Sequence, residues 1–443
     1  MSPAKLIVTV VRYETVSLRL AFTGWLLIGI TSCGEAQPQP LDVGTSNGIS
    51  NGPDAGPDAA PLDVLVRLAA TPGMTVDELE PDGPRRVFAL AYEQPVDHRD
   101  PLGPRFVQSL FLMHRGEDRP MVLETEGYYV YAASLRELAE LLDANQLHVE
   151  HRFFGESAPA SPTWDDLTIE QAASDHHRVV TALRAIYPGP WLNSGASKGG
   201  MTAVFHRRFF PDDVVGTVAY VTPISFGAPD PRYLPFFATI GDAECRLALS
   251  EFQRLALGKR AQLEGHARAE AELYGVTYER VGLERAVEWA VAGVAWAFWQ
   301  YQDASQCAEV PDATADDGEI TAFLDLVSPV WFSSDSSVES FAPYYYQAYA
   351  ELGYPASSTE HLDDLLLYRD GSAEVASVFL PAGTAPTYDS VVMRDVDAWL
   401  RADGERLMFI CGDNDPWTGG AFELGGARDS YRFFVPQGNH YSL

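Results

Sequence analysis

The stretch Gly195-Ala196-Ser197-Lys198-Gly199 sets a serine between two glycines. An apolar run leads into it, and the residues from Gly200 to Phe210 that follow can form a helix. Where a strand turns directly into a helix, the residue at the turn is held in a strained backbone conformation, and side chains beside it would collide with neighbouring backbone. The glycines remove that collision, so the pattern predicts a nucleophile elbow with the Ser197 hydroxyl above a sheet. A bare pattern of this kind also arises by chance in glycine-rich loops, so other parts of the chain have to support it.

Two later segments supply that support. Residues 406–411 (Arg-Leu-Met-Phe-Ile-Cys) predict a buried strand that runs into Asp413 and Asp415, and residues 430–435 predict another strand that is followed by His440. Serine, aspartate and histidine, each on a loop directly after a strand and in this order, are typical of the α/β-hydrolase triad. We therefore expect an α/β protein, with an α/β-hydrolase fold, a mostly parallel central sheet and an inserted helical cap domain.

The three residues have distinct expected roles. Ser197 attacks a carbonyl carbon, while His440 takes the serine proton and later gives it to the leaving group. Asp415 holds the imidazole in one tautomer and stabilises its charged form. Asp413 is the competing carboxylate, and we favour Asp415 because the rigid Pro416 that follows fixes its loop.

The oxyanion hole is expected between the elbow and a loop after an early strand. Lys198 follows the serine and would donate its backbone N–H. Residues 120–124 predict the early strand, and Gly127 and Tyr128 in the following loop are the candidates for the second donor. Glu124 and Glu126 in the same segment could bind a cationic group such as the free amino terminus of a peptide, or they could be ordinary acids of a solvated loop.

Four longer motifs carry a family resemblance: Glu150-His151-Arg152-Phe153-Phe154-Gly155-Glu156-Ser157, Ser194 to Thr202, His206-Arg207-Arg208-Phe209-Phe210-Pro211-Asp212-Asp213, and Asn414-Asp415-Pro416-Trp417. Together they resemble the secreted bacterial serine peptidases of family S37, which are tripeptidyl-aminopeptidase-like and similar to the S28 group of prolyl carboxypeptidases and dipeptidyl peptidases. The resemblance runs from about Arg85 to the end of the chain. It implies that Ser197, Asp415 and His440 form the triad and that the enzyme hydrolyses peptide bonds near a terminus.

The amino terminus predicts export. Basic residues precede an apolar run over residues 20–30 that is too short to span a bilayer, which is typical of a signal peptide. Ile30-Thr31-Ser32-Cys33 looks like a bacterial lipobox, so residues 1–33 are expected to be a lipoprotein-type signal peptide with Cys33 as the lipidated residue. The alternative is a plain signal peptide and a soluble secreted or periplasmic protein. Residues 34–63, rich in Gly, Pro, Asn, Ser and Asp, predict a flexible tether.

The remaining chain divides into three predicted parts: residues 64–229 and 396–443 form the hydrolase domain, and residues 230–395 form a helical cap insertion. Apolar residues at helical spacing between Asp242 and Tyr301 indicate the cap helices. A cap above the triad would restrict access to chain ends and short peptides. The cap aromatics (Trp289, Trp296, Phe298, Trp299, Trp331 and Tyr344 to Tyr346) are expected to form the cap core for the most part, with a substrate pocket as the alternative role.

Four cysteines are present, Cys33, Cys245, Cys307 and Cys411. If Cys33 is lipidated and Cys411 is buried on the strand before Asp415, Cys245 and Cys307 are left to pair within the cap, which an exported protein permits.

The composition excludes some classes of binding partner. The 443 residues carry a formal net charge of −31, which argues against nucleic acid and against anionic membrane surfaces. Membrane contact is therefore expected only through a lipid anchor on Cys33, and peptides are the expected substrates. No cysteine and histidine spacing indicates a metal site and no glycine loop indicates a phosphate, so no cofactor is expected. Two alternatives to a peptidase are a carboxylic ester hydrolase with the same triad and a catalytically silent binding protein on the same scaffold.

Overall fold

The computed structural model describes residues 62–161, 163–369 and 377–441. The predicted signal peptide, Cys33 and most of the predicted tether lie outside the described residues. The first described helix is α2 (Val64–Ala69), which begins where the Asp63 side chain accepts a hydrogen bond from the Leu65 N–H. Within the described ranges, no helix is both long enough and apolar enough to cross a membrane.

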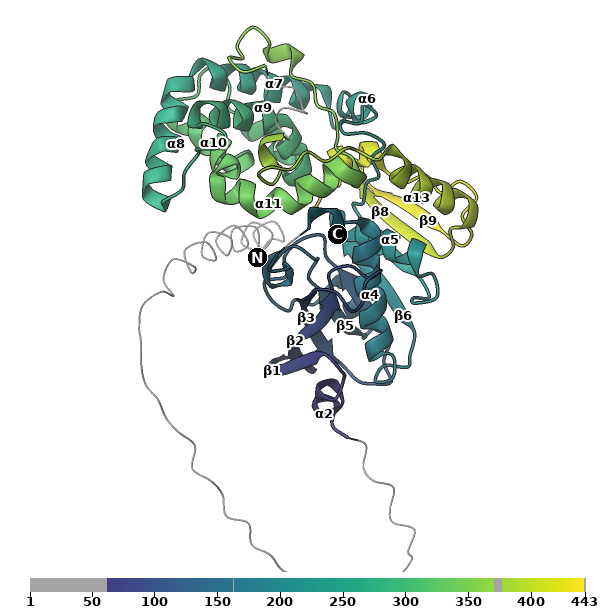
Figure 1. Ribbon diagram of the computed structural model, residues 1–443. Coiled ribbons are helices and arrows are strands. Elements are labelled where there is room, and N and C mark those ends of the chain that lie inside the picture. The colour runs from purple at the N-terminus through teal and green to yellow at the C-terminus, as the bar shows by residue number, and fades with distance from the viewer. Residues whose placement is uncertain (1–61, 162, 370–376, 442–443) are drawn as a thin grey trace, which may run out of the picture. The chain divides into compact units, whose positions relative to one another are not determined.

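A nine-stranded sheet is the centre of the described structure, with the order β1-β2-β3-β5-β4-β6-β7-β8-β9 (Figure 1). Its strands are β1 (Met74–Asp82), β2 (Arg85–Pro95), β3 (Arg105–His114), β4 (Met121–Thr125), β5 (Asn145–Val149), β6 (Trp191–Ala196), β7 (Thr217–Tyr220), β8 (Leu407–Gly412) and β9 (Tyr431–Val435). Strands β1, β2, β3 and β5 pair antiparallel, and every pair from β5 to β9 is parallel. This topology confirms the predicted α/β-hydrolase fold.

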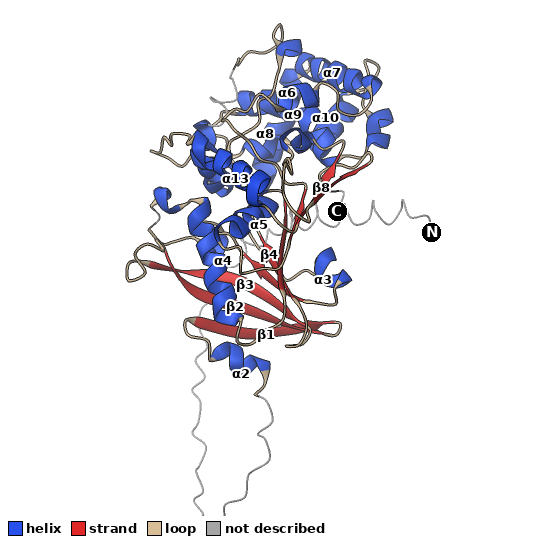
Figure 2. Cartoon of the chain, turned by 90° about the vertical axis from the view of Figure 1, so that its right-hand side faces the viewer, coloured by secondary structure: helices blue, strands red, loops and turns tan. Residues whose placement is uncertain are grey.

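Both faces of the sheet are covered by helices. Side chains of α4 (Ile169–Leu183) pack on Leu123 and Leu147, while α5 (Lys198–Phe209) and α13 (Ser390–Asp403) pack on β7 and β8. Val122, which points the other way on β4, contacts α3 (Glu137–Leu141) through Ala139. Figure 2 shows α3 on the opposite side of the sheet from α4. The carboxyl ends of the parallel strands stay uncovered by these helices, and active sites of open α/β sheets lie at that edge.

A helical insertion between β7 and β8 has an apolar core of its own. Figure 1 shows it as a layer beyond the strand ends, on the side away from α2. Its elements are α6 (Tyr233–Phe237), α7 (Ala243–Gly258), α8 (Arg260–Tyr274), α9 (Leu283–Tyr301), η3 (Ala304–Glu309), α10 (Asp317–Val327), η4 (Val330–Ser333), α11 (Asp335–Gln347), η5 (Ala348–Leu352) and η6 (Glu360–Leu362). We call it the cap.

The predicted carboxyl-terminal boundary of the cap needs one correction. The prediction placed residues up to 395 in the insertion, but α13 begins at Ser390 and packs on the sheet as one unit. Its apolar stripe starts with Met393, which is fully buried with Phe205 and Phe409 rather than with the cap core. The hydrolase part therefore resumes before residue 395.

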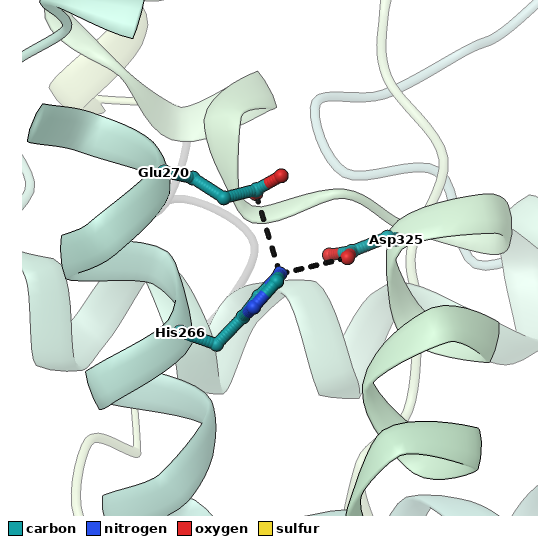
Figure 3. Close-up of side chains that lie close together, drawn as sticks. All are labelled: His266, Glu270 and Asp325. Carbon is teal, nitrogen blue, oxygen red and sulfur yellow. Dashed lines mark hydrogen bonds and ion pairs between the residues drawn. The ribbon is translucent and has the colours of Figure 1, made fainter. Parts of the chain in front are cut away.

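An ion-pair group joins two cap helices (Figure 3). His266 Nε2 on α8 lies 2.8 Å from an Asp325 oxygen on α10 and 3.6 Å from a Glu270 oxygen one turn along its own helix. Among the described residues this is the one group of histidine, cysteine and acidic side chains close enough together to hold a metal ion. All three side chains are half-buried and His266 pairs with both acids, so pairing within α8 and between α8 and α10 accounts for the group and we assign no cation to it.

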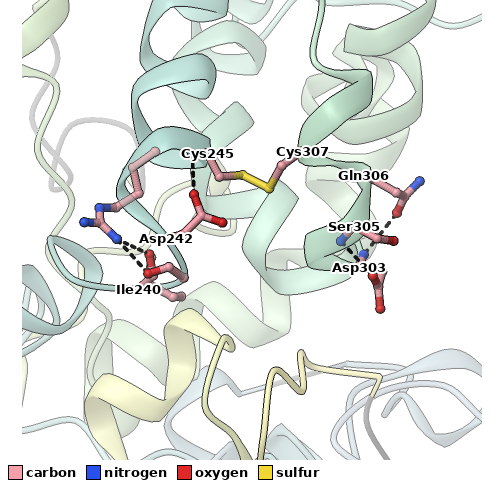
Figure 4. Close-up of a disulfide and its surroundings, with 9 residues drawn as sticks. Ile240, Asp242, Cys245, Asp303, Ser305, Gln306 and Cys307 are labelled. Carbon is pink, nitrogen blue, oxygen red and sulfur yellow. Dashed lines mark hydrogen bonds between the residues drawn. A yellow bond between two sulfur atoms is a disulfide. The ribbon is translucent and has the colours of Figure 1, made fainter.

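A disulfide links two other parts of the cap (Figure 4). It joins Cys245, in the first turn of α7, to Cys307 on η3, with the two Cα atoms 5.3 Å apart. The first turn of α7 is further ordered by Asp242, whose side chain accepts a hydrogen bond from the Cys245 N–H at 2.7 Å. Cys411 is a free, buried thiol on β8. The disulfide thus ties the segment that follows α9 to the start of the cap.

Candidate active site

Ser197 lies at the turn between β6 and α5, with φ 56° and ψ −125°. This left-handed conformation is costly for a residue with a side chain and is held here by its surroundings. The Ser197 N–H donates to the Tyr220 carbonyl on β7 at 2.9 Å. A Cβ atom on Gly195 or Gly199 would come within 2.6 Å of the Thr125 carbonyl oxygen or closer, so both neighbours of the elbow have to be glycine.

Asp415 and His440 meet at the ends of β8 and β9. Asp415 is fully buried, and one of its oxygens accepts a hydrogen bond from His440 Nδ1 at 2.7 Å. Its other oxygen accepts from the Trp417 N–H at 3.0 Å, because Pro416 and Trp417 begin a short helical turn that Asp415 caps. Asp413 is exposed to solvent. The carboxylate beside the histidine is therefore that of Asp415.

Among the described residues, no hydrogen bond joins the Ser197 hydroxyl to the His440 ring. Nδ1 is occupied by Asp415, so Nε2 is the nitrogen left for proton transfer. Bonds of this kind are often long without substrate and shorten only in the reacting complex.

The cap holds the loop that carries the histidine. The His440 N–H donates to the Gln300 carbonyl in the last turn of α9 at 3.0 Å, and Asn439 Nδ2 donates to the Gln302 carbonyl at 3.0 Å. The Tyr301 ring lies 6.4 Å from the His440 ring. Sequence reasoning missed this contribution, because residues 140 positions apart meet only through the cap.

Aromatic side chains from the cap and the hydrolase part lie beside His440 and beside the loop after β4. The Trp417 ring lies 6.4 Å from His440 and 5.6 Å from Trp296 on α9. On the other side, Tyr128 contacts Tyr344 of α11 at 5.7 Å. The other cap aromatics named in the sequence lie elsewhere: Phe298, Trp299 and Tyr345 in the cap core, Trp289 on Phe379, Trp331 beside Phe332, and Tyr346 on Trp164. Trp296 and Tyr344 are thus the two that reach the site.

The predicted oxyanion donors come together at the elbow. Gly127 and Tyr128 follow β4, which is the parallel neighbour of β6, and a Cβ atom on Gly127 would lie 2.5 Å from Lys198 Cβ. In the part of the chain that the structure describes, the backbone N–H groups of Gly127, Tyr128 and Lys198 donate to no protein acceptor. Free donors that meet beside a nucleophile are suited to bind an oxyanion.

Glu124 and Glu126, the two carboxylates predicted to bind a substrate amine, differ in position. Glu124 points to the α3 face of the sheet, as Val122 does, and only 6% of it is exposed. It is therefore not presented to a substrate, which corrects the prediction for that residue. Glu126 is partly exposed, and one of its oxygens accepts hydrogen bonds from His148 Nε2 at 2.6 Å and from Arg136 at 3.4 Å.

The position of Glu124 predicts a pH-dependent stability. Burial raises the pKa of Glu124 from an ordinary 4.5 to about 7, and one of its oxygens has no hydrogen-bond partner among the described residues. Because the folded state binds this proton more tightly than the unfolded state, stability falls as the pH rises from 4.5 to 7. The loss is about 3 kcal/mol, at 1.36 kcal/mol per pKa unit.

We expect Glu124→Gln to be more stable than the parent protein at pH 8, and the advantage to disappear at pH 4. Urea unfolding at both pH values measures the difference. Glu140→Gln, an exposed acid on α3, is the matched control. An advantage of the same size at both pH values would contradict this explanation.

Arg152, in the first of the longer motifs, has a structural role. The guanidinium is fully buried and binds both oxygens of Asp175, at 2.7 and 2.8 Å. It also donates to the carbonyls of Val96 and Asp166. Similarly, the motif after the elbow pairs His206 with Asp213 at 2.9 Å and closes the turn after α5. Arg152 and His206 are therefore structural, whereas Phe154 of the first motif contacts Tyr128 in the loop beside the elbow.

A cavity lies apart from Ser197, Asp415 and His440. It measures about 420 Å³ and is lined by Trp164, Tyr346, Glu351 and the segment 384–387. No triad residue contributes to its walls, so it is a separate feature.

Known proteins resemble all or part of this chain. The family model described as "PS-10 peptidase S37" matches residues 55–442. The chain is 39% identical over 432 residues to a prolyl tri/tetrapeptidyl aminopeptidase of Streptomyces mobaraensis, covering 96% of this chain and 87% of that protein. A lysosomal Pro-X carboxypeptidase of Mus musculus is 30% identical over 166 residues, 33% of this chain and 34% of that protein. Among solved structures, a proline iminopeptidase of Mycobacterium smegmatis matches with a TM-score of 0.34 and 14% identity, over 79% of this chain and 91% of that chain.

Proposed function

The chain belongs to the S37 family of serine peptidases, and from this membership we propose that it removes short peptides from the amino terminus of peptide substrates through a Ser197–His440–Asp415 triad. The observation that carries the proposal is the pairing of His440 Nδ1 with the buried Asp415 at the same sheet edge as the strained Ser197. The aminopeptidase activity of the Streptomyces mobaraensis relative supports the direction of cleavage.

The proposed reaction proceeds through an acyl-enzyme. His440 Nε2 takes the Ser197 proton as the hydroxyl oxygen attacks the scissile carbonyl, and the resulting imidazolium is stabilised by Asp415. Negative charge on the carbonyl oxygen is met by the N–H groups of Lys198 and of Gly127 or Tyr128. His440 then protonates the leaving amine, the Ser197 ester is hydrolysed by water, and the serine is regenerated.

The cap accounts for exopeptidase specificity in this proposal. Its Trp296 contacts Trp417, its Tyr344 contacts Tyr128, and its Gln300 carbonyl accepts a hydrogen bond from His440, so we expect it to restrict the access of folded proteins to Ser197. Short peptides meet no such barrier.

A panel of chromogenic substrates tests the proposed function. It contains dipeptides, tripeptides and tetrapeptides with free and blocked amino termini, together with short acyl esters, and uses the protein from residue 62 onward. Cleavage of free tripeptides or tetrapeptides is expected. Turnover of esters alone would identify an ester hydrolase instead, and turnover of no substrate would indicate a silent binding protein.

We propose Glu126 as the carboxylate that receives the substrate's amino terminus. It directly precedes the oxyanion loop, and 21% of its side chain is exposed. Its bonds to His148 and Arg136 compete with an incoming ammonium group, so the substrate would have to displace Arg136.

On this proposal, Glu126→Gln is expected to lower kcat/KM by about 10-fold to 100-fold for free-amine peptides, the range of a lost charged hydrogen bond. Peptides with an acetylated amino terminus should be affected far less. Glu156→Gln, at an exposed acid in the short helical turn after β5, is the control. Equal losses on free and blocked peptides would exclude Glu126 as the amine ligand.

Export with a lipid on Cys33 is the proposed localisation. The cap disulfide supports an oxidising compartment, where such bonds persist. Cys33→Ala should move the protein from the membrane fraction to the soluble fraction after cell lysis, and an unchanged distribution would reject lipidation.

A further inference from the structure

Lys198 has a buried side chain that the reaction described above does not use. The residue is 3% exposed, and its side-chain nitrogen, Nζ, donates to the Gly127 carbonyl at 2.7 Å. The rings of Tyr128 and Phe154 lie 5.6 and 5.4 Å from Nζ. Among the described residues Nζ has no other hydrogen-bond partner. Burying a lysine against a single carbonyl and two rings is costly, so a compensating role is expected.

The environment of Lys198 excludes one obvious role. A Ser-Lys dyad would require a bond between Nζ and the Ser197 hydroxyl, whereas Nζ is bonded to the loop across the site. The loop lies so close to the elbow that a Cβ atom on Gly127 would be 2.6 Å from Lys198 Cγ. The lysine side chain thus connects the elbow to the loop that carries the second oxyanion donor.

The hydrogen bond from Lys198 to the Gly127 carbonyl also fixes the direction of the next N–H group. The Gly127 carbonyl and the Tyr128 N–H belong to one peptide unit, and in a trans peptide these two groups point in opposite directions. A bond that holds the carbonyl toward Nζ therefore also sets the direction of the Tyr128 N–H. Rotation of this peptide would turn the carbonyl oxygen toward the site and remove the donor.

We propose that Lys198 is the positioning residue of the oxyanion hole: its backbone N–H is one donor, and its side chain holds the Gly127–Tyr128 peptide so that Tyr128 supplies the other. This inference rests on the proposed serine peptidase function. It assigns the second donor to Tyr128 rather than Gly127. It also explains why the residue after the nucleophile carries a long side chain with a hydrogen-bond donor at its end.

Lys198→Met tests the proposal, because methionine has a similar length and no donor. We expect kcat to fall by about 100-fold to 1,000-fold, the effect of losing one oxyanion donor, with KM changed little. The inhibition constant of a peptide aldehyde, which forms a tetrahedral adduct, should rise by the same factor as kcat falls. The dissociation constant of an uncleaved peptide, measured with Ser197→Ala as background, should stay the same.

Two further variants separate positioning from folding. Met201→Leu, at a buried position on the same helix, should leave kcat and aldehyde inhibition unchanged. Lys198→Gln keeps a donor and should recover part of the lost kcat, even if Lys198→Met unfolds at a lower temperature.

The outcomes distinguish this inference from the proposed function. If the wild-type protein hydrolyses peptides and Lys198→Met keeps its kcat, or loses substrate and aldehyde affinity equally, the positioning role is wrong and the peptidase stands. If the wild-type protein hydrolyses none of the panel, the proposed function fails and the role of Lys198 fails with it.

Discussion

Replacing Ser197 by alanine is expected to lower kcat on free tripeptides by about 10⁶-fold, as loss of the nucleophile does in other serine peptidases. Among the described residues the free thiol, that of Cys411, offers no substitute, because it is buried on β8 and burial raises its pKa to about 12. Release of the chromogenic group, followed over hours at high enzyme concentration, measures the residual rate.

The controls for this variant are its unfolding temperature and its peptide affinity. Alanine keeps the strained backbone of Ser197, so the variant should unfold at nearly the same temperature and bind peptides as the parent does. Residual activity within a factor of ten of the parent would show that a contaminant or another residue performs the hydrolysis.

Asp415→Asn is expected to lower kcat by about 10⁴-fold, the effect of the equivalent change in serine proteases. An amide in place of the carboxylate can donate a hydrogen bond to His440 Nδ1, which favours the tautomer with the proton on Nε2. That tautomer cannot take the proton of Ser197. The pair is buried, so solvent does not correct the tautomer.

Asp413→Asn is the matched control, because Asp413 lies two residues away and is exposed. It should retain the activity of the parent protein within about twofold, since exposed substitutions have small effects. Comparable losses in the two variants would contradict the assignment of Asp415.

The sheet could be predicted where burial makes strands apolar. Strands β4 and β8 are buried between helices and appear in the sequence as short apolar runs that end in turns, whereas the buried strand β6 (Trp-Leu-Asn-Ser-Gly-Ala) is recognised by the glycine-flanked serine that follows it. Strand β1 could not be recognised this way, because it is an edge strand whose residues from Glu78 to Asp82 are exposed and mostly charged or polar. Strand β7 is only four residues long, which is too short for a pattern.

Some residues of the candidate site could likewise be predicted from the local sequence, and others could not. Ser197, Asp415 and His440 follow strands directly, so their local sequence indicates where they lie. The bond from His440 to Gln300, the direction of the Lys198 side chain and the burial of Glu124 depend on packing between distant segments. No local pattern encodes such contacts, and the error for Glu124 arose because a loop-end acid and a buried strand acid look alike in sequence.

The central claim is that Ser197 is the nucleophile, activated by His440. The most direct test treats the folded protein with a fluorophosphonate, which phosphonylates activated serines, and maps the modified peptide by mass spectrometry. The account predicts one modification, on Ser197, with simultaneous loss of peptide hydrolysis and with much slower labelling in Asp415→Asn. Peptide hydrolysis that continues after complete labelling of Ser197, or a modification at another serine that abolishes it, would contradict the account.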